Sequence, residues 1–388
     1  MNIENVETWL LEVGAAASSI DAFALEFRDF LLAAGVPIGF FNLGMFVLHP
    51  EVAGVAFSGS ATGDLARIVV DHDALATPVF LNSPLRIVTA ERRSLSYDLT
   101  DFTARAEFPI LQEFHAKGLQ RYQAWPLVAR HGPCSILSLA LTDVDGPAIA
   151  AIERALPLLS VVLELHAARF LKELLLRTYV GERSAREVLA GRFRRGDHRG
   201  IEAVLWLSDV RGFTQLSQRF CGPDVVRWLD QVFDTLAEPV ERAGGEILKF
   251  IGDAMLAIFP VDEFGSQAEA CQAALGAARE AQRGVEASAL KAESEGRPAL
   301  RTGIALHIGN VVYGNVGAKN RLDFTVIGDA VNRVSRIESL AHKSLSGIVV
   351  SADVAGCLSE PTVRLGTFPM KGYDEPVDVF TIAAEPAR

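Results

Sequence analysis

Two aspartates in the C-terminal half of the chain have the surroundings of a metal site. Asp209 ends the apolar run 203–207, which is typical of a buried strand, and Asp253 follows Gly252 at a turn between two alternating runs. If those strands are neighbours, the two carboxylates meet at one end of a sheet. Such hard oxygen ligands suit Mg²⁺ or Mn²⁺ better than zinc. Alone, each aspartate is more often a turn residue that bonds its own backbone.

The segment 322–336 contains groups that could hold a nucleotide. It reads as a strand, a turn at Gly328 and a helix, and Asn332 and Arg336 are four residues apart on one helix face. The amide can bind a sugar, and the guanidinium fork can bind a phosphate. The alternative is a solvated helix face, and we expect Asp329 to be the N-cap of this helix. The turn at Gly212 also leads into a helix, whose first N–H groups could cradle a phosphate.

The elements expected to position these residues form an α+β domain with a βαββαβ core. The strands are expected at 203–207, 246–250, 254–259, 301–308, 311–315 and 348–350, and the helices at 224–243, 269–289 and 329–340.

The N-terminal half predicts a small α/β sensor domain that resembles GAF or PAS domains in layout. A helix over 6–34 precedes strand-like runs at 39–48, 54–57, 125–128 and 135–141, and a second helix covers 147–180. The apolar spacing of that second helix suits pairing with its twin in a dimer, and equally packing onto its own domain. Pro157 predicts a kink or restart within it.

A change of charge marks the junction between the two halves. Residues 151–200 hold ten basic and six acidic side chains, a net charge of +4, whereas the whole chain of 388 residues has a net charge of -11. The basic side chains are expected on a solvated linker, and they include Arg183, Arg186, Arg192, Arg194, Arg195 and Arg199. We therefore predict a sensory domain at 1–165, a helical connector at 166–200 and a catalytic domain at 201–388.

Composition excludes several classes of protein. An acidic net charge argues against a nucleic-acid-coating protein, and 49 % apolar residues argue against a disordered one. The four cysteines have no CxxC spacing, which argues against a zinc site or a disulfide framework. The N-terminal residues have no signal-peptide pattern, and no apolar run is long enough to span a bilayer. We expect a cytoplasmic protein without membrane insertion.

Residues 201–380 resemble the catalytic domain of class III nucleotidyl cyclases, the adenylate and guanylate cyclase family. The matching stretches are 208–214, 246–254, 324–338 and 369–380. The resemblance implies that Asp209 and Asp253 bind metal, with the Val210 carbonyl as a further ligand. It also implies that Asn332 orients the ribose and Arg336 stabilises the transition state.

The resemblance assigns the remaining substrate contacts as well. Lys371 would contact the β- and γ-phosphates, and Lys249 and Thr325 would select the base. Phe213 and Thr214, which follow the turn at Gly212, would also bind the substrate. Lys with Thr resembles a subgroup that includes bicarbonate-responsive adenylate cyclases, whereas guanylate cyclases usually carry Glu at the first position. A lysine donor suits the adenine N1 acceptor, so adenine is favoured.

The implied activity is conversion of ATP to 3′,5′-cyclic AMP and pyrophosphate, with two Mg²⁺ or Mn²⁺ ions per site. In this family the site forms between two catalytic domains, so a chain with both halves implies a homodimer. Asp209 and Asp253 would come from one chain, and the other site residues from its partner. The alternatives are a guanylate cyclase and an inactive nucleotide-binding signalling module. The ligand sensed by residues 1–165 is unknown.

Overall fold

The computed structural model describes residues 2–128, 132–144, 146–192, 194 and 196–383. The chain divides into two compact units, Met1–Leu175 and Leu176–Arg388. The three-part division expected from sequence stays a prediction. No helix in the described ranges is both long and apolar enough to cross a membrane.

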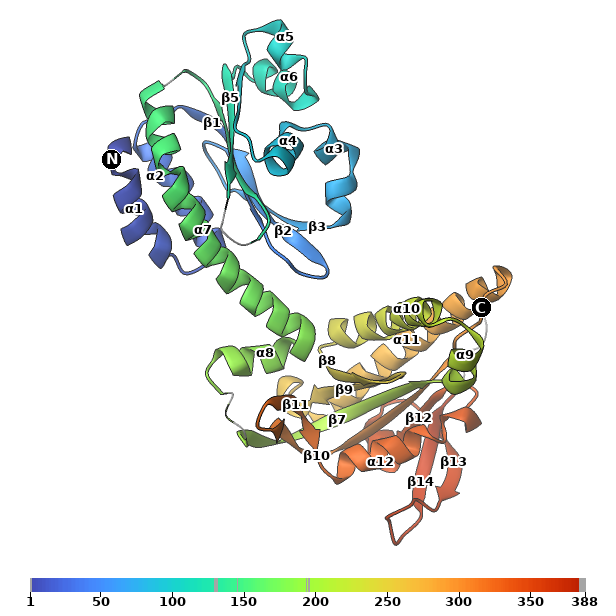
Figure 1. The fold of residues 1–388 in the computed structure, drawn as a ribbon. Helices are drawn as coiled ribbons and strands as arrows, with labels where there is room; N and C mark the ends of the chain where they lie inside the picture. The colour runs from blue at the N-terminus through green and yellow to red at the C-terminus, as the bar shows by residue number, and fades with distance from the viewer. Residues whose placement is uncertain (1, 129–131, 145, 193, 195, 384–388) are drawn as a thin grey trace. The chain divides into compact units, whose positions relative to one another are not determined.

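The first unit is built on a six-stranded antiparallel sheet in the order β3-β2-β1-β6-β5-β4 (Figure 1). Its strands are β1 (Ile38–Phe46), β2 (Val52–Ser60), β3 (Ala66–Asp71), β4 (Leu95–Asp98), β5 (Arg121–Leu127) and β6 (Ser135–Leu141). Its α-helices are α1 (Val6–Glu12), α2 (Ile20–Ala33), α3 (Pro78–Leu81), α4 (Pro84–Glu91), α5 (Phe102–Arg105), α6 (Pro109–Ala116) and the start of α7 (Gly146–Val180).

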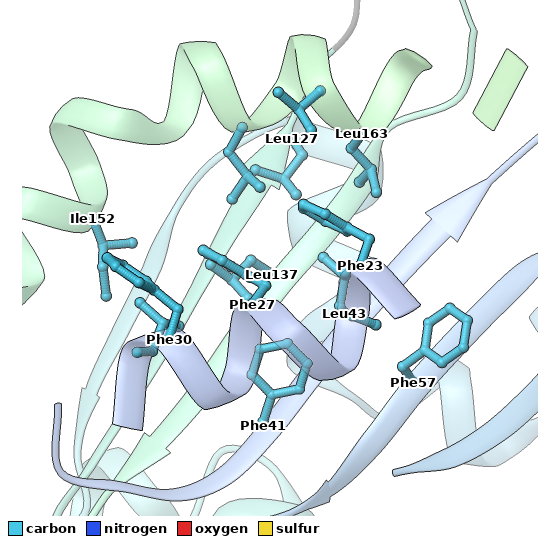
Figure 2. Close-up of a cluster of buried hydrophobic side chains, with 14 of the residues drawn as sticks. Phe23, Phe27, Phe30, Phe41, Leu43, Phe57, Leu127, Leu137, Ile152 and Leu163 are labelled. Carbon is cyan, nitrogen blue, oxygen red and sulfur yellow. The ribbon is translucent and has the colours of Figure 1, made fainter. Parts of the chain in front are cut away.

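The core of this unit lies where α2 and α7 meet the sheet. Phe23, Phe27 and Phe30 recur every three or four residues, so they share one face of α2. Figure 2 shows these rings packed among strand residues such as Leu43 and α7 residues such as Ile152. All five of these side chains are buried, so a continuous apolar layer holds both helices on the sheet.

Two helices differ from the sequence predictions. The expected helix over 6–34 is two helices, because the chain turns near Gly14 and Ser19 then caps α2 by accepting a hydrogen bond from the Ala22 N–H at 3.1 Å. The expected restart of the helix at Pro157 was wrong, since α7 continues through it, and the expected kink stays a prediction. Buried Ile152 and Leu159, on either side of the proline, pack into the same core and hold the helix together.

The second unit has the predicted mixed α+β composition. Its eight-stranded sheet has the order β13-β14-β12-β10-β7-β9-β8, with β11 paired to β10. The strands are β7 (His198–Val210), β8 (Glu246–Ile251), β9 (Ala254–Pro260), β10 (Thr302–Ala318), β11 (Arg321–Ile327), β12 (Ile348–Ser351), β13 (Thr362–Phe368) and β14 (Val377–Ile382). The α-helices are α8 (Glu182–Leu189), α9 (Phe213–Arg219), α10 (Gly222–Arg242), α11 (Gln267–Ser294), α12 (Asp329–Glu338) and α13 (Ala352–Cys357).

Strand β7 is buried on both faces because helices cover both sides of this sheet. Figure 1 shows α10 and α11 on one face and α12 on the other. Val204 and Trp206 pack with residues of α10 and α11, whereas Ala203 and Leu205 pack with Val334 of α12. This alternation explains why 203–207 reads as a continuous apolar run.

The two strands predicted at 301–308 and 311–315 are a single strand, β10. It pairs with β7 without a break, from Thr302 opposite Val210 to Gly314 opposite His198. The far part of β10 also pairs with β11, from Val312 opposite Ile327. One end of β10 therefore lies beside the end of β7 that holds Asp209, and its other end enters the β10–β11 hairpin that precedes α12.

The predicted solvated linker is wrong at Arg183, which is 7 % exposed in α8. Its guanidinium donates to Glu263 Oε1 at 2.5 Å and lies 5.6 Å from the centre of the Tyr313 ring. Next to it, the Ser184 N–H donates to Glu246 Oε1 at 3.1 Å, and Glu246 is the first residue of β8. Arg195 lies outside the described residues. Helix α8 is thus docked onto the sheet by buried polar groups.

Candidate active site

Asp209 and Asp253 lie together at one end of the sheet. Asp209 pairs in register with Ala254, the residue after Asp253, because the β8–β9 hairpin turns at Gly252 beside β7. Gly252 has a φ of 66°, a conformation that suits glycine. Burial, the charge of Asp253 and a hydrogen bond between the two carboxyls together raise the pKa of Asp209 to about 6.

This carboxylate pair fits a hard divalent cation. Two acids that repel each other and share a proton gain most from a bound cation, which removes the repulsion. Among the residues that the structure describes, no three His, Cys, Asp or Glu side chains gather closely enough to hold a metal by themselves. Further ligands would therefore have to be a backbone carbonyl, such as that of Val210, or substrate oxygens.

A third carboxylate, Glu338, stands near the pair. Burial and the charges of Asp209 and Asp253, opposed by the guanidinium of Arg211, raise the pKa of Glu338 to about 7. Gly303, opposite Asp209 in the ladder, leaves space for Glu338: a Cβ added there would lie 2.8 Å from Glu338 Oε1. The end of α12 is thus seated against the strand end that carries Asp209.

Helix α12 presents Asn332 and Arg336 on its exposed side. The opposite side holds the buried residues Val334 and Ile337, so the amphipathic pattern fixes which way the helix faces. Neither exposed side chain has a hydrogen bond or ion pair within the described part of the chain, which leaves the amide and the guanidinium free for a ligand.

The expected cap at Asp329 was wrong. Gly328 occupies the N-cap position, and no side chain caps the helix there. Asp329 instead accepts a hydrogen bond from the Tyr373 hydroxyl at 2.7 Å, and its carboxylate is 3.7 Å from the Arg333 guanidinium. These contacts hold the loop that contains exposed Lys371 against the start of α12, so Lys371 and Asn332 belong to one local structure.

Lys249 lies on β8 and Thr325 lies on β11. These two strands contact each other although they do not pair, since β11 pairs with β10 and the strands β7 and β9 stand between β10 and β8. Lys249 Nζ donates to Asp323 Oδ2 at 2.5 Å, and Asp323 is two residues before Thr325 on β11. Thr325 is 6 % exposed, and its Oγ1 finds no hydrogen-bond partner among the described residues. A buried hydroxyl without a partner is typical of a site that a ligand completes.

Phe213 and Thr214 begin α9 directly after the turn at Gly212, whose φ is 72°. Phe213 packs against the core, and Thr214 is exposed. The turn joins the end of β7 to this short helix, so both residues follow Asp209 closely in space as well as in sequence.

Residues 200–383 match the sequence model described as the adenylate and guanylate cyclase catalytic domain. These residues form a domain of that family. The match covers the strands and helices that carry Asp209, Asp253, Asn332 and Arg336, so the geometry above is that of a cyclase domain.

Two curated relatives match the same part of the chain. An adenylate cyclase of Anabaena cylindrica is 33 % identical over 181 residues, which are 45 % of this chain and 36 % of the relative. Adenylate cyclase 1 of Rhizobium meliloti is 32 % identical over 185 residues, 47 % of this chain and 27 % of the relative. The chain spans about a third of the length of these relatives.

The solved structures that resemble this chain include that of the adenylyl cyclase CyaB from P. aeruginosa. It is 24 % identical, has a TM-score of 0.46 and covers 49 % of this chain and 97 % of its own.

Sequence reasoning missed three charged residues of the cyclase domain. Arg211 and Glu338 flank recognised motif residues, and Asp323 stands two residues before Thr325. The sequence offered one signal for these residues: each is charged and stands within two residues of a candidate site residue. It could not show which of these neighbours point toward the site, because that depends on how α12 and β11 pack.

Proposed function

We propose that the cyclase domain converts ATP to 3′,5′-cyclic AMP and pyrophosphate. The observation that carries this proposal is that the carboxyls of Asp209 and Asp253 lie together. Their negative charges repel each other unless a cation binds there. The curated relatives with the name adenylate cyclase support the same reaction. The strand order β10-β7-β9-β8 supports a ferredoxin-like core for this domain.

The chemistry follows from the residues assigned to each part of the substrate. The ribose 3′-oxygen attacks the α-phosphorus, its proton passes to solvent and pyrophosphate leaves. When bound at Asp209 and Asp253, two Mg²⁺ or Mn²⁺ ions would supply positive charge to the attacking and leaving oxygens. Arg336 would stabilise the negative charge that grows on the α-phosphoryl group, and Asn332 would orient the ribose. Lys371 would bind the β- and γ-phosphates, so positioning and charge provide most of the catalysis.

A homodimer is the assembly in which these groups act together. Asp209 and Asp253 of one protomer would face Asn332, Arg336 and Lys371 of its partner, giving two equivalent sites. Asn332 and Arg336 are exposed and have no side-chain partner among the described residues, which supports this arrangement. Each site would then be sensitive to small rotations of one protomer against the other.

Adenine is the proposed base because Lys249 is a cation at a base-selecting position. An ammonium donates only, which suits N1 of adenine and opposes the N1–H of guanine. The Thr325 hydroxyl both donates and accepts, so it serves either base. The Lys249 ammonium therefore favours ATP.

Regulation by the N-terminal unit is part of this proposal. Residues 1–165 would act as a GAF-like sensory domain, and the connector would pass its signal to the cyclase domain. The buried contact of Ser184 with Glu246 supports this role, since Glu246 begins the strand that carries Lys249. Movement of α8 would reach the base-binding strand directly.

The proposal is tested by incubating the purified full chain with Mn²⁺ and either ATP or GTP. Cyclic AMP and pyrophosphate are expected from ATP. Cyclic GMP as the main product would make the chain a guanylate cyclase, and no product from either nucleotide in a folded dimer would reject the enzyme. A matched control is Glu280→Gln, which removes one charge of an exposed ion pair with Arg242 and is expected to keep full activity.

A further inference from the structure

We propose that α7 carries a self-complementary stripe on which α7 of a second copy of this chain docks in parallel. The stripe belongs to the first unit, whereas the candidate active site belongs to the second. It would be an interface separate from the one between cyclase domains. The inference rests on the proposed function only in taking the assembly to be a homodimer.

One side of α7 packs on its own unit. Ile152, Leu159 and Leu163 are buried in the core that α7 shares with α2 and the sheet. Figure 2 shows Ile152 and Leu163 pointing toward the rings of α2. These side chains have their partners within the unit, so this side of the helix offers no surface to a second copy.

The other side of α7 carries a second apolar row that the described residues leave exposed or half-exposed. Val161 is 60 % exposed and Leu165 is 40 % exposed. Steps of three and four residues alternate along the row, which consists of Leu158, Val161, Leu165, Ala168, Lys172 and Leu175. At 3.6 residues per turn, this row lies on roughly the opposite side of the helix from the buried one. The alternation is that of positions a and d in a coiled-coil seam.

The row has a defined start and one polar position. Arg154 stands one step before Leu158, and its guanidinium contacts Glu4 Oε2 at 2.7 Å, so the seam begins at Leu158. Lys172 is at position a, where a single lysine specifies register and the number of strands at a cost in stability. Because its own core covers the other side of each helix, the seam has room for one neighbour, which gives a two-stranded pair.

The charges beside the row match those of a second copy. Glu164 is at position g and Arg169 is at position e of the next heptad, and these positions face each other across a parallel pair. The Arg169 Nη1 donates to the Ala17 carbonyl at 3.5 Å, which leaves other guanidinium donors for a partner. A parallel dimer therefore forms two pairs of Glu164 with Arg169. An antiparallel pair aligns g with g and e with e, so it cannot bring these charges together.

The first test measures the dissociation constant of the full-chain dimer by sedimentation for wild type, Val161→Asp and Val79→Asp. Val161→Asp puts two carboxylates against each other in the seam, so we expect the constant to rise at least about tenfold. Val79 is 85 % exposed on α3, and its replacement should leave the constant unchanged. Both valines are exposed, so both variants are expected to fold. An unchanged constant in Val161→Asp, or an equal rise in both variants, would overturn the inference.

Charge exchange tests the pairing of Glu164 with Arg169. Glu164→Arg and Arg169→Glu each replace two attractive pairs per dimer by repulsive ones. Exposed ion pairs are weak, so each change should raise the dissociation constant by roughly 2- to 30-fold. The chain with both changes has opposite charges again and should return close to the wild-type constant. A double variant that dimerises no more tightly than the single variants would reject parallel docking.

Cross-linking tests the orientation directly. In a parallel pair in register, Val161→Cys and Lys172→Cys each face their own copy, so each should form a disulfide-linked dimer with oxidised glutathione. In an antiparallel pair at most one position of the seam meets itself. The wild-type chain, in which Cys221 is exposed, gives the background of linkage through native cysteines. Linkage above background at only one of the two positions, or at neither, would overturn the inference.

Cyclase activity is measured on the same samples, because this inference and the proposed function can fail separately. An inactive wild type whose dimer is weakened by Val161→Asp but not by Val79→Asp rejects the activity and keeps the inference. An active wild type whose dimer is unchanged in both variants keeps the activity and rejects the inference.

Discussion

Replacing Gly303 with alanine would force α12 away from the strand end that carries Asp209. Gly303 lies opposite Asp209 in the β7–β10 ladder, and the new Cβ would be 2.7 Å from the Ala341 Cβ and 2.8 Å from Glu338 Oε1. Carbon atoms pack best at about 3.5–4.0 Å, so Ala341 would have to move by roughly 0.8 Å or more.

The magnitude follows from overpacking a tight contact. Such substitutions cost about 1–3 kcal/mol of stability, and about 1 kcal/mol corresponds to roughly 2–4 °C in Tm for a unit of this size. We therefore expect Tm to fall by roughly 2–12 °C. Because α12 also carries Arg336, for which we propose a catalytic role, and a shift of about 1 Å at a catalytic group can cost about 100-fold, we expect kcat to fall roughly 10- to 100-fold.

The assay is thermal unfolding and steady-state cyclase activity of the full chain, with Gly276→Ala as the matched control. Gly276 lies inside α11, and a Cβ there meets no atom within 4 Å, so this alanine should stabilise by about 0.5–1 kcal/mol and leave activity unchanged. A Gly303→Ala variant with wild-type Tm and activity would refute the reasoning. Lost stability with full activity would refute its link to catalysis.

Three further outcomes are expected. Asp209→Ala and Arg336→Ala chains should each be inactive, yet an equal mixture should recover about a quarter of wild-type activity, since half the dimers then hold one intact site; no recovery in verified heterodimers would contradict a shared site. Removing metal with EDTA should abolish activity, and Asp209→Asn should weaken Mn²⁺ binding, measured by calorimetry, at least about tenfold; unchanged affinity would exclude Asp209 as a ligand. Burial lowers the pKa of His307 to about 4, below its unfolded value of about 6.5, so stability should be lost as pH falls from about 6.5 to 4, by up to roughly 3 kcal/mol. The measurement is the free energy of unfolding in denaturant as a function of pH, and His307→Gln should make it depend less on pH. The control His342→Gln, at an exposed position, should leave the pH dependence unchanged. If His307→Gln also left it unchanged, His307 would not be the group responsible.

Local pattern was enough to predict most elements of the second unit. The run 203–207 is apolar because both faces of β7 are covered, and Gly252 with Asp253 forms the expected hairpin turn. Residues close in sequence share a strand end or a helix face, so Asp209, Asp253, Asn332 and Arg336 could be proposed before any coordinates. Boundaries were less predictable: β10 continues through the expected gap because its partner β7 is equally long.

Only the tertiary structure placed charges from distant segments together. Glu338 lies near Asp209, Lys249 pairs with Asp323, and Arg183 is buried beside Tyr313 rather than solvated. Each of these side chains looks like an ordinary surface charge in the sequence, because helix and strand periodicity describe one element at a time. Their pKa values and partners depend on which elements pack and which water is excluded, and that is decided by the fold as a whole.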